Sequence, residues 1–410
     1  MSTLNNAQSP GLGARLRSWF LTRKQKKQNR HDPTAIQADS VVPICSVLHV
    51  INGEYYSGAE RVQDLLAQTL PEMGVQVGIA CIKPGRFAEQ RGSKDTPLYE
   101  IPMRGRFDIR PAFQLARIAR REGYDILHAH TPRSLMIATV AGMIAKLPIV
   151  YHVHSPAAAD STKRWSNRIN SLIEWFCMTW VTAVIPVSES LRQRTITAGC
   201  SPEMVHLVRN GVPARPVRPV RSKNQKEWII GTVALFRPRK GTEILLNAMA
   251  KLHREGVPVR LRAVGPFETE EYEKTLKDRA ERLGINEVID WTGFTSDVDA
   301  ELAKMDLFVL PSLFGEGLPM VVIEAMAAGV PVIASNVEGI PEAIRDRVDG
   351  LLFQSGDVDE LVGAIEQFID GVIDWTAIHQ QEVDRHAEAF STESMASGVA
   401  QVYEQIICPA

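Results

Sequence analysis

The chain has 410 residues with 46 basic and 48 acidic side chains, a net charge of −2. Its 45% hydrophobic and 23% charged residues are ordinary for a globular protein and exclude a mainly disordered chain. The length predicts two or three domains, and the near-neutral charge argues against a general nucleic-acid binder. The longest apolar runs, 135–145 and 175–187, are shorter than the ~18 residues that a spanning helix needs. Five scattered cysteines without a C-x-x-C pair indicate a reducing compartment, the cytoplasm.

Two segments combine basic with aromatic residues. Residues 11–30 hold seven basic side chains and no acidic one, beside Trp19 and Phe20. We predict residues 1–40 as a basic, disordered N-terminal extension. An interfacial anchor on anionic lipid at the inner face of the membrane stays open as the alternative. The segment 163–180 has the same two alternatives: a core helix with surface charge, or a helix resting on the membrane with the extension.

Further along, strands and helices alternate. Short β-branched runs predict strands at 44–50, 75–82, 125–130, 149–153 and 183–187, with amphipathic helices between them. After a linker rich in proline and basic residues at 213–227, strands are predicted at 228–235, 259–264, 288–291, 307–310, 332–334 and 351–353. This alternation predicts an α/β chain of two doubly wound, Rossmann-like parallel-sheet domains, 41–212 and 228–385, that face a cleft. Residues 386–410 are predicted to pack back toward the N-terminal domain.

The stretch after the predicted strand 307–310 has the pattern of an anion site. A glycine-containing loop leads into a helix, and Pro319 has the fixed φ that suits the first helical position. The backbone N–H groups of Gly317 and Leu318 are then free to face a ligand, because the first N–H groups of a helix have no partner within it.

Charged side chains flank two such loops. Glu316 lies in the loop and Glu324 two helical turns beyond it, a separation that suits two parts of one extended ligand. A buried carboxylate suits a cis-diol because it only accepts hydrogen bonds. Arg237, Arg239 and Lys240 form a phosphate-sized positive spot before a predicted helix. From spacing alone, ordinary surface ion pairs and a solvated loop stay open.

Two patterns could suggest a metal, and we assign none. The D-x-D strings at 297–299 and 357–359 precede helices, and Ser296 and Asp357 have the spacing of helix caps. Four histidines alternate on two predicted strand ends without a carboxylate or cysteine to complete a ligand set, so we predict a polar cleft lining. They are His128, His130, His152 and His154.

The motifs together resemble glycosyltransferase family 4, the group 1 glycosyltransferases, over about residues 44–405. The E-x7-E spacing of Glu316 and Glu324 is followed by E-A-M-A-x-G-x-P-V, and residues 57–61 are similar to the family's G-G-A-E-R turn. V-S-E at 187–189 and N-G-V at 210–212 also match. The resemblance implies a retaining, metal-independent hexosyltransferase of the GT-B fold. It implies a nucleoside diphosphate sugar as donor, a cell-surface glycan or lipid-linked sugar as acceptor, no other cofactor and no nucleic-acid partner.

The resemblance also implies residue roles. Glu324 would hold the donor ribose, Glu316 the donor sugar, and Lys240 the diphosphate. His154 would lie near the anomeric carbon, although His152 replaces the family's threonine. The family's diphosphate arginine is replaced by Leu235, so Arg237 or Arg239 is expected to substitute; we favour Arg237 because Arg239 is expected to face solvent. The catalytic candidates are Lys240, Glu316 and His154, and the donor-binding candidates are Gly58, Arg237, Arg239, Gly265, Gly317, Leu318 and Glu324.

Two other classes of function stay open from the sequence. A non-catalytic nucleotide-sugar-binding protein would use the same charged residues without turnover. A nicotinamide-dependent dehydrogenase would use the same sheet topology, but no strand–helix turn carries G-x-G-x-x-G with an acidic residue ~20 positions later.

Overall fold

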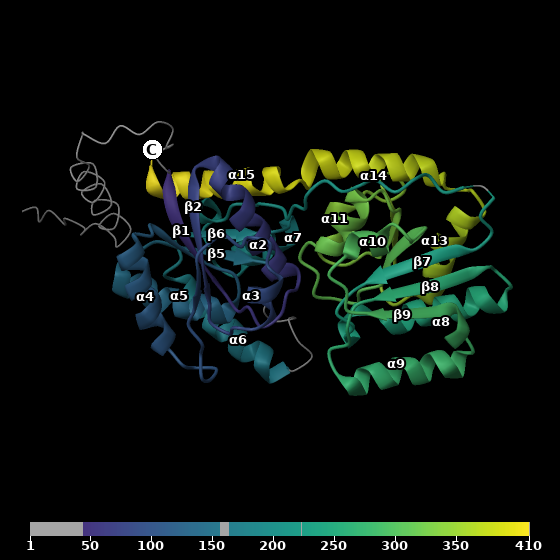
Figure 1. Cartoon of the computed structure of the whole chain (residues 1–410), viewed down its shortest axis with the longest axis horizontal. Helices are drawn as coiled ribbons and strands as arrows, with labels where there is room; N and C mark the ends of the chain where they lie inside the picture. Colours follow the sequence, from purple (N-terminus) through teal and green to yellow (C-terminus); the bar gives the residue numbers. More distant parts are fainter. Residues whose placement is uncertain (1–43, 156–163, 223, 410) are drawn as a thin grey trace, which may run out of the picture.

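A computed structural model of the chain describes residues 44–155, 164–222 and 224–409. The predicted basic extension at 1–40 lies outside these residues. Two six-stranded parallel sheets lie side by side, each flanked by helices (Figure 1). The prediction of two doubly wound α/β domains is confirmed. No helix in the described part of the chain combines the length and the apolar character needed to cross a membrane.

The first sheet builds the N-terminal domain, with strand order β3-β2-β1-β4-β5-β6. Its central strands are buried along their whole length because helices cover both faces. Strand β3 was not predicted from the sequence; it has three residues, none of them fully buried. The strands are β1 (Cys45–Ile51), β2 (Val75–Cys81), β3 (Leu98–Glu100), β4 (Ile126–Ala129), β5 (Ile149–Val153) and β6 (Ala183–Pro186). The helices are α2 (Gly58–Thr69), η1 (Leu70–Met73), α3 (Arg86–Gln90), α4 (Arg110–Glu122), α5 (Pro132–Ala145), α6 (Arg164–Met178), α7 (Glu189–Thr197) and η3 (Pro202–Met204).

The second sheet builds the C-terminal domain, and its order β12-β11-β10-β7-β8-β9 repeats the topology of the first. Its strands are β7 (Trp228–Val233), β8 (Val259–Val264), β9 (Ile289–Gly293), β10 (Leu307–Leu310), β11 (Val332–Ser335) and β12 (Leu351–Phe353). Its helices are η4 (Pro238–Lys240), α8 (Thr242–Arg254), α9 (Glu270–Leu283), η5 (Asn286–Val288), α10 (Val298–Leu302), α11 (Met320–Ala327), α12 (Ile340–Ala343) and α13 (Val358–Ile369). In both sheets the strand order reverses beside the first strand, where open α/β sheets bind ligands.

Two C-terminal helices run along one side of both domains (Figure 1). Helix α14 (Trp375–Ala389) packs on α11, and α15 (Thr392–Ile407) packs on α2 and η1 of the N-terminal domain. The predicted boundary at residue 385 therefore falls inside α14, and the chain returns between the two helices. There Val212 donates its N–H to the carbonyl of Phe390 at 2.9 Å. The outward and return crossings of the chain are bonded to each other.

Candidate active site

A cavity of about 340 Å³ lies where loops at the carboxyl ends of both sheets meet. The N-terminal domain contributes the loop and helix start after β1 and the end of β5. The C-terminal domain contributes the loops after β7, β8 and β10. Of the predicted site residues, only Glu324 lies outside this lining. Those that line it are Gly58, His154, Arg237, Arg239, Lys240, Gly265, Glu316, Gly317 and Leu318.

The basic loop after β7 turns its side chains onto the loop after β10. Gly241 has φ +64, and a Cβ there would lie 2.0 Å from the carbonyl oxygen of Pro311, so only glycine lets the two loops approach this closely. As a result Lys240 Nζ lies 2.5 Å from Glu316 Oε1, and Arg239 Nη1 lies 3.3 Å from the same oxygen. The expectation that Arg239 faces solvent is wrong, because Glu316 draws its guanidinium inward.

Glu316 is held as a carboxylate. It is 4% exposed, and Ser312 Oγ donates to its Oε1 at 2.7 Å. Burial favours the neutral acid, but the charges of Lys240 and Arg239 outweigh it and lower the pKa of Glu316 to about 2. Burial also lowers the pKa of Lys240, against the attraction of Glu316. An ionised Glu316 can only accept hydrogen bonds, which suits the hydroxyls of a sugar.

Glu324 is completely buried on α11 and joins the two domains. Its Oε1 accepts from Arg61 on α2 and, at 3.2 Å, from Arg215 Nη2, while its Oε2 has no partner in the described structure. Neither arginine was predicted from the sequence as a site residue. Arg61 also lines the cavity, so it stands between Glu324 and any ligand there. One signal could have identified it: Arg61 ends the 57–61 motif on which the family resemblance partly rests.

Several glycines bring backbone close to backbone around the cavity. A Cβ at Gly317 would lie 2.0 Å from the carbonyl oxygen of His154 across the domain boundary, and one at Gly265 would lie 1.9 Å from that of Ala234. By contrast, a Cβ at Gly58 would meet only Met320, at an ordinary 3.7 Å. Any need for glycine at position 58 therefore comes from a ligand and not from the fold.

The remaining polar patterns agree with the predictions in part. His154 lines the cavity, whereas His128, His130 and His152 are buried behind it, so the prediction that all four line the cleft is wrong. The first carboxylate of each D-x-D string caps a helix, as predicted: Asp297 Oδ1 accepts from Ala300 N at 2.9 Å, and Asp357 caps α13. Asp297 caps α10 in place of the predicted Ser296, and Pro319 is the N-cap of α11 and not its first helical residue.

Two sequence families match adjoining parts of the chain. Residues 56–215 match Glycosyltransferase Family 4, and residues 215–380 match Glycosyl transferases group 1. The UDP-Gal:alpha-D-GlcNAc-diphosphoundecaprenol alpha-1,3-galactosyltransferase of Escherichia coli is 23% identical over 348 residues, 79% of this chain and 88% of the relative. The MMP alpha-(1->4)-mannosyltransferase of Mycolicibacterium hassiacum is 28% identical over 319 residues, 73% of this chain and 75% of the relative.

A solved structure supports the same fold. The structure of Anabaena Alr3699/HepE in complex with UDP and glucose has a TM-score of 0.77 at 22% identity, and the match covers 88% of this chain and all of that one. The family matches exclude the dehydrogenase alternative, and the named relatives are transferases. The chain therefore belongs to the group 1 glycosyltransferases and is a glycosyltransferase enzyme of the GT-B fold.

Proposed function

We propose that this enzyme moves a sugar, with retention and without a metal ion, from a nucleoside diphosphate sugar to a glycan or lipid-linked acceptor on the cytoplasmic side of the membrane. The charge of the cavity is the observation that carries this proposal. Five basic side chains line it, while Glu316 is the one acidic residue among the described lining residues. A strongly anionic ligand is the natural complement of this lining. The basic residues are Arg61, Arg86, Arg237, Arg239 and Lys240.

Within this ligand, the diphosphate belongs beside Lys240 and Arg237. Arg239 is committed to Glu316 at 3.3 Å and to the carbonyl of Gly315 at 3.1 Å, whereas Arg237 makes a longer ion pair of 3.8 Å with Glu268. We therefore place Arg237, whose ion pair is the longer of the two, beside the diphosphate. The sugar hydroxyls belong with Glu316 and with the N–H groups at Gly317 and Leu318.

The ribose role of Glu324 requires a rearrangement. Arg61 now occupies Oε1, so a ribose would bind at Oε2 or displace the guanidinium. Calorimetric titration with donor would test this on Glu324→Ala, for which we propose weaker binding. Unchanged affinity would remove the ribose role.

Charge stabilisation on the leaving group is the main catalytic task in such a site. Lys240 and the neighbouring arginines can supply it where other transferases use a metal ion bound by D-x-D. The first aspartate of each D-x-D string here caps a helix, and the second forms an ion pair. Losing one well-placed electrostatic donor typically costs about 3–4 kcal/mol of barrier. The Glu316 carboxylate binds Lys240, Arg239 and Ser312. These contacts stabilise its negative charge, so the carboxylate is poorly suited to act as a nucleophile. A front-face route, in which the departing phosphate assists the acceptor, suits this arrangement.

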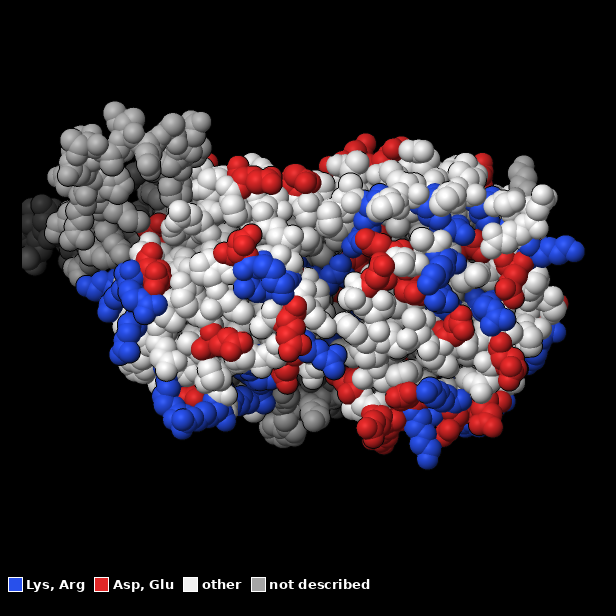
Figure 2. Space-filling view, in the orientation of Figure 1, with Lys and Arg blue, Asp and Glu red and all other residues white. Residues whose placement is uncertain are grey.

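A lipid-linked acceptor would bring the enzyme to a membrane, and one surface fits such contact. Helices α4 and α6 both pack on α5, and their outer faces carry exposed apolar side chains; Trp175 is 64% and Phe176 61% exposed. Helix α4 itself carries four arginines, and Figure 2 shows basic side chains gathered over that helix. Aromatic and basic residues together favour an anionic lipid interface. The exposed apolar residues are Phe107, Ile109, Phe113, Leu172, Trp175, Phe176 and Trp180.

The first experiment identifies the donor. A thermal-shift screen of nucleoside diphosphate sugars should reveal the donor, since a ligand at 100 times its Kd adds about 2.7 kcal/mol to the free energy of unfolding. The product's anomeric configuration, read by NMR, then tests retention, and unchanged turnover in EDTA tests metal independence. Undetectable donor hydrolysis and transfer across the donor and acceptor panel would contradict the proposal.

Membrane contact is tested separately by sedimentation with phosphatidylglycerol vesicles. The double variant Trp175→Ser, Phe176→Ser should bind less, and Val372→Ser, an equally exposed apolar change on the C-terminal domain, should not. Deleting residues 1–40 should also reduce vesicle binding and leave activity on a soluble acceptor intact. Equal sedimentation of all variants would exclude this surface.

A further inference from the structure

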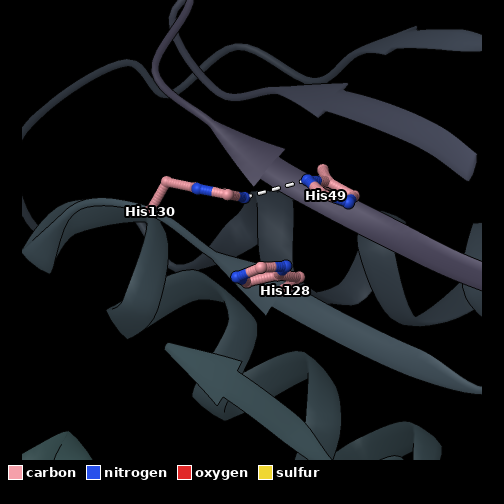
Figure 3. Close-up of side chains that lie close together, drawn as sticks. All are labelled: His49, His128 and His130. Atoms are coloured by element: carbon pink, nitrogen blue, oxygen red, sulfur yellow. Dashed lines mark hydrogen bonds between the residues drawn. The ribbon is translucent and has the colours of Figure 1, made fainter. Parts of the chain in front are cut away.

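Five histidines gather on one face of the N-terminal sheet, behind the cavity. His49 on β1 is the register partner of His128 on β4, and Figure 3 shows both beside His130. Four of the five are completely or almost completely buried, and the fifth, His154, lines the cavity. Helix α15 covers the group with Tyr403, which is also completely buried. The five are His49, His128, His130, His152 and His154.

Four of these rings and the tyrosine form one continuous series of hydrogen bonds. His154 Nε2 lies 3.1 Å from His130 Nδ1, and His130 Nε2 lies 2.9 Å from His49 Nδ1, the link drawn in Figure 3. His49 Nε2 lies 3.3 Å from the Tyr403 hydroxyl, which lies 2.5 Å from His128 Nδ1. We call this series the histidine chain. His152 stacks on His154 at 4.3 Å and stays outside it.

The protons of the histidine chain are not independent. Burial lowers the pKa of each histidine and raises the pKa of Tyr403, so every member is neutral at physiological pH. A neutral imidazole has one N–H and one bare nitrogen, and the hydroxyl has one proton. Each link needs one proton between its two atoms. All N–H groups must therefore point along the chain in the same direction, toward His128 or toward His154.

The two contacts of Tyr403 select the direction. Hydroxyl donors make shorter hydrogen bonds than N–H donors, so the 2.5 Å contact marks His128 Nδ1 as the acceptor of the tyrosine proton. In the longer contact of 3.3 Å, His49 Nε2 then donates its N–H to the tyrosine oxygen. In the rest of the histidine chain, His130 Nε2 then donates to His49 Nδ1, and His154 Nε2 donates to His130 Nδ1. His154 Nδ1 is left bare, and it has no partner in the described structure.

We propose that Tyr403 is a positioning residue that fixes His154, through His49 and His130, as the tautomer protonated on Nε2. His154 Nδ1 is then an acceptor that cannot donate, and because the atom itself is buried, a ligand must displace its neighbours to reach it. That it serves a hydroxyl of the bound sugar rests on the proposed function; the tautomer itself does not. Helix α15 thus controls the chemistry of the cavity without contacting its contents.

A metal ion is the competing explanation for the cluster. Two groups of three, His49 with His128 and His130, and His130 with His152 and His154, have ring nitrogens within 4.8 Å of one another. Both groups consist of neutral ligands, so an ion would be a buried double charge without an anionic partner. It would also need bare nitrogens where the histidine chain has N–H groups.

The ring nitrogens can be observed directly. In the full-length protein labelled with 15N-histidine and free of substrate, two-bond 1H–15N correlation spectra should show His154 with a protonated Nε2 and a bare Nδ1; the His154→Gln spectrum assigns it. Tyr403→Phe removes two links, so His154 should populate both tautomers and turnover should fall about tenfold. Tyr124→Phe, which removes a buried hydroxyl paired with Tyr99 among the described residues, should change neither.

Three results would overturn the proposal. One is a protonated Nδ1 on His154 in the unaltered protein, which decides the matter even if Tyr403→Phe does not fold. Another is an unchanged His154 tautomer in folded Tyr403→Phe, whatever its activity. The third is stoichiometric zinc in the purified protein that is lost in His152→Ala. None of these readings requires that the enzyme transfer a sugar, so failure of the proposed function is recognised separately.

Discussion

Arg61 and Glu324 form an ion pair that joins the two domains. The guanidinium comes from α2, the carboxylate is completely buried on α11, and Arg215 shares the same oxygen at 3.2 Å. Two cations therefore share one carboxylate, and Arg215 also pairs with Asp299. Arg61, which lines the cavity, lies between this carboxylate and a ligand there.

Replacing this carboxylate should destabilise the protein. Glu324→Gln leaves Arg61 and Arg215 without their shared charge partner, and breaking a buried ion pair from one side typically costs about 3 kcal/mol or more. Urea unfolding measures the change. Asp359→Asn, which removes an exposed partner of Lys251, is the control and should cost less than about 1 kcal/mol. Similar losses in the two variants would mean that the Glu324 pair contributes no more than a surface pair.

Lys240 should dominate the electrostatics of the reaction. Lys240→Ala removes the cation closest to Glu316 and to the proposed diphosphate, and we expect turnover to fall at least about a hundredfold. Steady-state kinetics with saturating donor measure this. Lys251→Ala, on helix α8 and paired with the exposed Asp359, should retain full turnover. Near-normal turnover of Lys240→Ala would remove it from the diphosphate site.

Glu316 predicts a specific dependence of stability on acid. Its folded-state pKa of about 2 is below the ordinary value of 4.5, so its contribution is present above pH 4.5 and is lost as the pH falls toward 2. Between pH 7 and pH 3 the parent protein should lose about 2 kcal/mol more unfolding free energy than Glu316→Gln. Urea unfolding of both proteins at the two values tests this. Parallel losses would show that Lys240 and Arg239 do not hold the carboxylate ionised.

Gly317 should not tolerate a side chain. In Gly317→Ala the new Cβ would lie 2.0 Å from the His154 carbonyl oxygen, so the two domains must move apart. We expect about 2 kcal/mol of lost stability and at least tenfold lower turnover, as for overpacked sites. Gly363→Ala, in helix α13 where a Cβ meets open space, is the control and should be neutral or stabilising. Full activity in Gly317→Ala would show that this contact is not part of the working enzyme.

Much of the fold could be predicted from local pattern. Strand β10 is a continuous apolar run, and the loops after β7 and β10 have turn residues before the helices α8 and α11. Strand β3 was not predicted, because a half-buried strand of three residues is too short to show the alternation of apolar and polar residues.

The site was predicted only where one loop holds the relevant residues. Glu316 and Lys240 stand in recognisable loops, whereas the ion pair of Arg215 with Glu324 spans 109 positions, and Arg215 lies in a segment rich in proline and basic residues that indicates only a linker. His49 was missed for the same reason: nothing local connects a single histidine in an apolar strand to residues 79 or more positions away. The inward orientation of Arg239 could not be predicted either, because it depends on a contact with Glu316, 77 positions away.

The paired crossings of the chain limit how the domains can move. Val212 bonds to Phe390, its carbonyl lies 3.0 Å from His386 Nε2, and Gly211 leaves no room for a Cβ beside Ser391. Any relative motion of the two domains that pulls these crossings apart must break both hydrogen bonds. The cavity is therefore expected to open by motions that leave the two crossings together.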